Sequence, residues 1–86
     1  MTDVQMYPIV VDAARRAILN RFVELGTLPG GNANPKAFVA LMNHFRGGSF
    51  NVACQQLADD LDIEVLPNGF YRLTLKGYET ARAMRT

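Results

Sequence analysis

Residues 66–77 read Leu66-Pro67-Asn68-Gly69-Phe70-Tyr71-Arg72-Leu73-Thr74-Leu75-Lys76-Gly77, which is the pattern of a hairpin followed by a helix start. Pro-Asn-Gly between two apolar runs predicts a tight turn, because proline fixes φ while asparagine and glycine tolerate positive φ. The flanking runs, residues 63–66 and 70–74, are the predicted strands. Thr74 is expected to cap a last helix that reaches about residue 85, with Tyr78 and Ala81 as its core contacts.

Residues 8–25 show the periodicity of an amphipathic helix. Pro8 suits the first helical position and Gly26 suits a C-terminal stop. Leu19 and Val23 lie outside the main apolar stripe and widen the apolar surface. That width allows the helix two partners, so a homodimer through the first and last helices is one predicted arrangement. The main stripe consists of Val11, Ala14, Ile18, Phe22 and Leu25.

A connector rich in Gly, Pro and Asn follows at residues 27–33, with room for a short strand near Leu28. No Gly-Lys-Ser/Thr follows its glycines, so a phosphate-binding loop is not indicated. The second helix is expected to begin at Asn34 and Pro35, because asparagine is a good cap and proline suits the first turn. Its apolar stripe consists of Phe38, Leu41, Met42 and Phe45.

Gly47 and Gly48 end the second helix and form a short turn before the third. Ser49 or Asn51 is expected to cap the third helix through its side chain. Two helices joined by about three residues that include glycine are the helix-turn-helix arrangement. The apolar stripe of the third helix consists of Phe50, Ala53, Cys54, Leu57, Ala58 and Leu61.

The order helix, optional strand, helix, turn, helix, hairpin, helix resembles winged helix-turn-helix domains of the MarR/PadR type. In those families the recognition helix leads into a β-hairpin wing that closes with a Tyr-Arg-Leu-Thr-x-x-Gly-like segment. Tyr71-Arg72-Leu73-Thr74-Leu75-Lys76-Gly77 matches that segment, and Leu57-Ala58-Asp59-Asp60-Leu61-Asp62-Ile63 stands at the end of the expected recognition helix. The resemblance implies an α+β, mostly α fold with three helices, a wing and a C-terminal helix, as one domain over residues 1–86.

The resemblance also implies that the third helix enters the major groove of DNA while the wing touches the backbone or the minor groove. Asn51, Val52, Gln55, Gln56 and Asp59 are expected on the outward face of that helix. Asparagine and glutamine can pair bidentately with adenine, so the expected base-reading residues are Asn51, Gln55 and Gln56. The expected phosphate contacts are Arg46, Arg72 and Lys76.

Two features of the sequence favour alternatives to the DNA contacts expected above. Arg72 can instead pair with Glu64 across the hairpin. Asp59, Asp60 and Asp62 crowd the end of the third helix as a solvated acidic patch, where DNA phosphates would repel them. The alternative function is therefore a protein-binding adaptor or inhibitor module that docks on a basic partner surface through these acids.

The chain has 86 residues, of which 49% are hydrophobic, and a net charge of +1. This composition is typical of a folded globular domain. This balance supplies no bulk attraction to nucleic acid or to a membrane. Residues 1–6 carry neither a basic n-region nor an apolar h-region, so no signal peptide is predicted. No apolar run has the length of a membrane span, so the expected location is the cytoplasm.

The remaining reactive side chains point to no catalytic chemistry. His44 is expected to be a partly exposed helix residue, and Cys54 a small core residue. One cysteine and one histidine cannot supply a structural zinc site, so no metal and no cofactor are predicted. The chain is thus not expected to be an enzyme. The aromatic residues Phe38, Phe45 and Phe50 fall on the buried stripes and are expected in the core.

Overall fold

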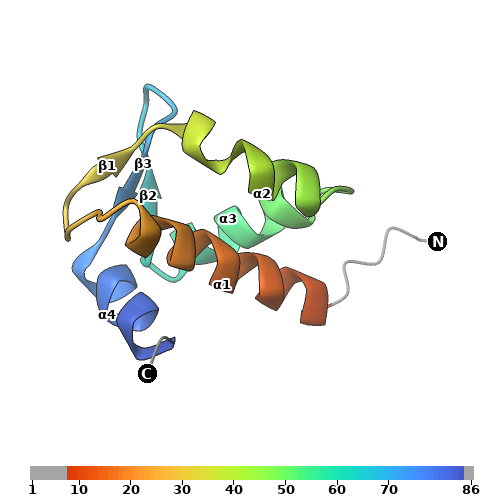
Figure 1. The fold of residues 1–86 in the computed structure, drawn as a ribbon, viewed down its shortest axis with the longest axis horizontal. Coiled ribbons are helices and arrows are strands. Elements are labelled where there is room, and N and C mark those ends of the chain that lie inside the picture. The colour runs from red at the N-terminus through yellow and green to blue at the C-terminus, as the bar shows by residue number, and fades with distance from the viewer. Residues whose placement is uncertain (1–7, 85–86) are drawn as a thin grey trace.

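The computed structural model describes residues 8–84, which form an α+β, mostly helical fold (Figure 1). The predictions that concern residues 1–6 and Arg85 lie outside this range. In chain order the elements are α1 (Pro8–Glu24), β1 (Asn32–Ala33), the 3-10 helix η1 (Pro35–Phe38), α2 (Val39–His44), α3 (Ser49–Asp59), β2 (Ile63–Val65), β3 (Tyr71–Leu73) and α4 (Leu75–Met84).

Helix α1 lies across the middle of the molecule and packs against both α3 and α4 (Figure 1). Leu19 is buried at 2% exposure and Val23 packs against the core, so the wide apolar surface of α1 is covered within the chain. Leu25, predicted in the stripe, is 40% exposed because the helix ends one residue before it. The largest fully buried side chains are Phe22, Phe38, Ile18, Leu57, Ile63 and Leu73.

The second helical segment begins as predicted, but with a tighter turn. The Asn34 side chain accepts a hydrogen bond from the Lys36 N–H at 2.9 Å, and Pro35 occupies the first turn of η1, which runs into α2. Phe38 is fully buried, whereas Phe45 is only half-buried.

The predicted side-chain cap of α3 is wrong. Gly48, at φ 91°, occupies the cap position, and no side chain bonds to the first turn of α3. The hydroxyl of Ser49 instead donates backwards to the Arg46 carbonyl oxygen at 3.0 Å, and Asn51 lies inside the helix. A glycine suits this position because positive φ costs it little.

The sheet is antiparallel with the strand order β1-β3-β2, and the hairpin of β2 and β3 has the predicted place and turn. Gly69 adopts φ 88°, its N–H donates to the Leu66 carbonyl at 2.8 Å, and the Asn68 side chain accepts from the Phe70 N–H at 3.0 Å. The short strand of the connector lies at Asn32–Ala33, on the far side of β3, and not near Leu28.

The junction between α3 and α4 is closely packed and held by hydrogen bonds to Thr74. The Thr74 hydroxyl oxygen accepts from the Gly77 N–H at 2.9 Å, which confirms the predicted cap. The same oxygen lies 2.6 Å and 2.9 Å from the carbonyl oxygens of Leu61 and Asp62. A Cβ atom on Gly77 would overlap the Asp62 carbonyl oxygen, so only glycine fits there.

Leu61 was expected as the last member of the apolar stripe of α3, and this is wrong. The helix ends at Asp59, and Leu61 follows in the left-handed region at φ 66° with 67% exposure. This turn reverses the chain so that Asp62, rather than Leu61, points into the protein at 2% exposure.

Candidate nucleic-acid interface

Helix α3 presents a narrow polar stripe to solvent. Asn51, Gln55 and Asp59 recur every four residues and are exposed. Because residues four apart share one face of a helix, these three side chains line the same edge. The opposite face carries Phe50, Ala53, Cys54 and Leu57, which are buried.

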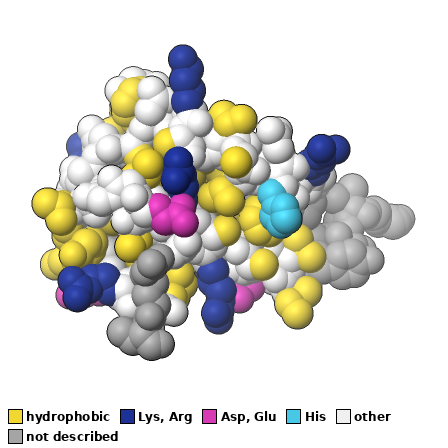
Figure 2. Space-filling view, in the orientation of Figure 1, with side chains coloured by type: hydrophobic (Ala, Val, Ile, Leu, Met, Phe, Trp, Pro, Cys, Tyr) yellow, Lys and Arg dark blue, Asp and Glu magenta, His cyan; other side chains and the backbone are white. Residues whose placement is uncertain are grey.

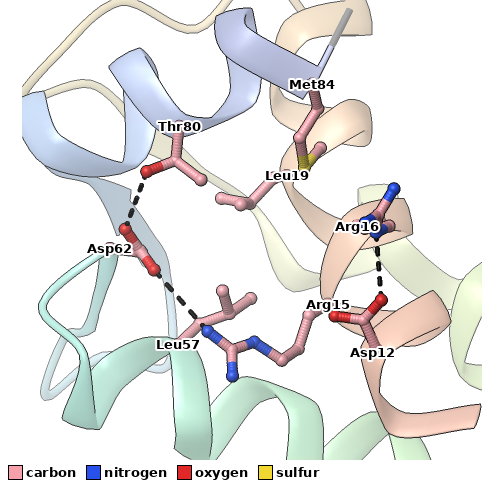
Figure 3. Close-up of a pocket in the computed structure, with 8 residues that line it drawn as sticks. All are labelled: Asp12, Arg15, Arg16, Leu19, Leu57, Asp62, Thr80 and Met84. Atoms are coloured by element: carbon pink, nitrogen blue, oxygen red, sulfur yellow. Dashed lines mark hydrogen bonds and ion pairs between the residues drawn. The ribbon is translucent and has the colours of Figure 1, made fainter. Parts of the chain in front are cut away.

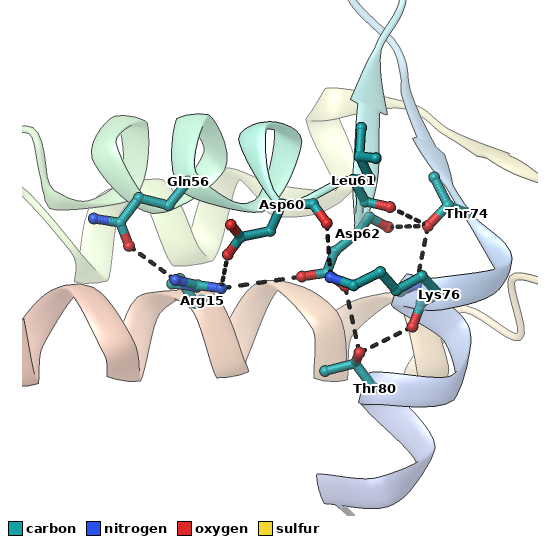
Figure 4. A network of polar contacts seen from close by, with 9 residues as sticks. Arg15, Gln56, Asp60, Leu61, Asp62, Thr74, Lys76 and Thr80 are labelled. Atoms are coloured by element: carbon teal, nitrogen blue, oxygen red, sulfur yellow. Dashed lines mark hydrogen bonds and ion pairs between the residues drawn. The ribbon is translucent and has the colours of Figure 1, made fainter.

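Gln56, expected among the base-reading residues, does not lie on this stripe. Its side-chain oxygen accepts from Arg15 Nη1 at 3.1 Å, and the residue is half-buried against α1 (Figure 4). Val52 likewise packs against the core. The expected outward face of five residues is therefore reduced to Asn51, Gln55 and Asp59.

The turn before α3 is hollowed and carries an arginine. A depression of about 400 Å³ is lined by residues that include Arg46, Gly47, Gly48 and Asn51. Arg46 Nε donates to the Asn43 carbonyl at 3.0 Å and the residue is exposed. Within residues 8–84 the Arg46 guanidinium forms no ion pair.

Acidic and basic residues are unevenly distributed along the sequence. Between Glu24 and Asp59 the sequence contains no acidic residue, while Lys36 and Arg46 lie in this interval at the two ends of the η1–α2 segment. Lys36 is exposed and, like Arg46, forms no ion pair in the described part of the chain. The small net charge of the whole chain conceals this local excess of positive charge, and inspection of charge by segment would have revealed it.

The two other expected phosphate contacts are engaged within the protein. Arg72 Nη1 lies 3.0 Å from Glu64 Oε1, which is the cross-strand pair offered as its alternative. Lys76 Nζ donates to the Asp60 carbonyl at 2.6 Å and to Asp62 Oδ1 at 3.1 Å (Figure 4). Arg72 and Lys76 would have to exchange these partners in order to reach a phosphate.

The expected solvated acidic patch is only partly present. The Asp62 side chain is 4% exposed, with Lys76 on one oxygen and Arg15 Nη2 4.0 Å from the other. Asp60 Oδ2 lies 2.6 Å from Arg15 Nη2 (Figure 4). Arg15, an α1 residue to which the sequence reasoning gave no role, thus neutralises two of the three acids. Asp59 is the one of the three that bonds only within α3.

A pocket of about 280 Å³ lies among α1, α4 and the end of α3 (Figure 3). Its polar groups bond to one another: Arg16 Nε donates to Asp12 at 3.0 Å, and the Thr80 hydroxyl lies 3.3 Å from Asp62 Oδ1. Leu19, Leu57 and Met84 supply its apolar wall. The internal pairing leaves this pocket without an evident ligand group.

On the face shown in Figure 2, Lys and Arg side chains stand apart from one another with hydrophobic side chains between them. His44 is exposed at the end of α2, with its ring 4.7 Å from that of Phe45. Cys54 is a core residue as predicted. Burial raises the pKa of its thiol to about 11, against the opposing effect of a hydrogen bond with Tyr71.

In residues 8–84, no three side chains of His, Cys, Asp or Glu gather closely enough to hold a metal ion. None of the helices described combines the length and apolar character that a bilayer crossing requires. Comparisons with protein-family models, with curated proteins and with solved structures found no match to this chain.

Proposed function

We propose that this chain is a small, non-enzymatic winged-helix protein that binds double-stranded DNA, in the manner of a transcription regulator. The element order and the sheet order β1-β3-β2 support the winged-helix part of this proposal, with α3 as recognition helix and the β2–β3 hairpin as wing. A cytoplasmic location and a homodimer stay predictions. A dimer would repeat the interface and so allow a palindromic site to be read.

One observation carries the proposal. The exposed amides of Asn51 and Gln55 adjoin a turn in which Arg46 forms no ion pair within residues 8–84, and this turn lies in a segment free of acidic residues. Cations position a protein on phosphates, and amides can read base edges, so both parts of a DNA contact are present on one surface.

Most of the acidic surface that the adaptor hypothesis requires is not available to a partner. It requires Asp59, Asp60 and Asp62 to face a basic partner, but Arg15 holds Asp60 and the Asp62 carboxylate is buried. The same pairing removes the phosphate repulsion that two of these acids would exert. The charge distribution therefore favours DNA over a basic protein surface.

The test is binding to a duplex over a range of salt concentrations. Each phosphate contact contributes about 0.9 to the slope of log affinity against log salt, so Arg46→Ala should lower that slope by about one. Arg82→Ala is the matched control, because Arg82 lies on α4 and its guanidinium stacks on Tyr78. The proposal fails if the wild-type protein shows no binding at low salt, or if both variants change the slope equally.

A further inference from the structure

The exposed stripe of α3 ends in a carboxylate that a neighbouring side chain holds in place. Gln55 Nε2 donates to Asp59 Oδ1 at 2.8 Å, one helical turn along. Because a carboxylate can only accept, Gln55 must turn its amide nitrogen toward Asp59. Asp59 Oδ2 has no partner among residues 8–84, and the residue is exposed.

This arrangement has a chemical preference among the bases. In the major groove guanine shows two acceptors, adenine an acceptor beside its amine, and thymine an acceptor beside its methyl group. Cytosine alone shows a donor, its N4 amine, with no acceptor of its own next to it. An oriented carboxylate oxygen is therefore attracted by cytosine and repelled by part of the edge of every other base.

We propose that Asp59 is a specificity-determining residue that selects cytosine, with Gln55 as its positioning residue; this inference rests on the DNA-binding function proposed above. The eight residue-to-residue steps from Asn51 to Asp59 span about 12 Å of helix. For a helix lying along the groove, this length corresponds to about three to four steps of 3.4 Å. The cytosine is thus expected three or four base pairs from an adenine that Asn51 contacts.

The experiment is selection of binding sites from a randomised duplex library by the wild-type protein and by Asp59→Asn. The wild-type protein should enrich sites that share a cytosine, with discrimination on the order of tenfold. Asp59→Asn should lose that enrichment and keep the adenine. Glu79→Gln is the matched control, because it removes an equal charge from an exposed position on α4 and should leave the selected sequence unchanged.

The outcomes separate this inference from the proposed function. If the wild-type protein binds duplexes but its selected sites share no cytosine, the inference fails and DNA binding stands. If Asp59→Asn binds every sequence more tightly by the same factor, Asp59 merely repels phosphates and the inference is overturned. If the wild-type protein binds no duplex, both fail. Gln55→Ala should weaken the cytosine preference while the selected sites keep the adenine that Asn51 contacts, which distinguishes loss of positioning from loss of structure.

Discussion

Replacement of Asp62 by asparagine tests whether the buried carboxylate that follows α3 stabilises the fold. The side chain is 4% exposed and accepts from Lys76 Nζ at 3.1 Å, and its second oxygen faces Arg15. Hydrogen bonds to charged groups contribute roughly 1.5–3 kcal/mol. Lys76 and Arg15 keep their bonds to Asp60, so we expect a loss near the lower end, about 2 kcal/mol.

In a domain of this size, 1 kcal/mol shifts the melting temperature by roughly 4–8 °C, so Asp62→Asn should lower it by about 10 °C. Asp59→Asn makes the same chemical change at an exposed position, and we expect it to alter the free energy of unfolding by less than about 0.5 kcal/mol. Thermal melting followed by circular dichroism, together with urea unfolding, measures both variants. If Asp62→Asn melted together with Asp59→Asn, the buried network would not stabilise the fold as argued.

Two further changes probe the packing. Gly77→Ala should destabilise the protein by about 3 kcal/mol in urea unfolding, because the new methyl group overlaps the Asp62 carbonyl. In a helix without such a contact, alanine is more stable than glycine by about 1 kcal/mol. Unchanged or raised stability of Gly77→Ala would therefore show that α4 does not pack closely against the Asp62 backbone. Burial raises the pKa of the Cys54 thiol from 9.0 to about 11, so the folded state keeps its proton longer than the unfolded state. The free energy of unfolding should therefore hold below pH 9 and fall between pH 9 and about 11, by at most about 1.4 kcal/mol per pH unit from this thiol. Cys54→Ala should remove that part of the fall, and equal pH slopes in the two proteins would refute the assignment.

Local chemistry made much of the fold predictable. Pro67, Asn68 and Gly69 specify their turn within a few residues, and Thr74 needs only the N–H of Gly77 to cap α4. The stripe of α1 follows from periodicity alone. These features depend on contacts between near neighbours in the chain, which a single sequence displays directly.

The misplaced site residues depend on contacts between distant segments. Gln56 and Asp60 are bonded to Arg15, which lies more than forty positions earlier and reaches across from α1. Asp62 is buried because the left-handed residue Leu61 turns the chain, although leucine is uncommon in that conformation. No local pattern signals either event. The acid-free interval around Arg46 was visible in the sequence, but the net charge of the whole chain concealed it.

The most direct test of the DNA-binding surface is a titration of isotope-labelled protein with a DNA duplex at low salt, followed by nuclear magnetic resonance. We expect the largest shift changes at Arg46, Asn51 and Gln55, and we expect added salt to reverse them. The absence of any shift change, or changes confined to α1 and α4, would contradict the proposal that α3 and the turn before it contact DNA.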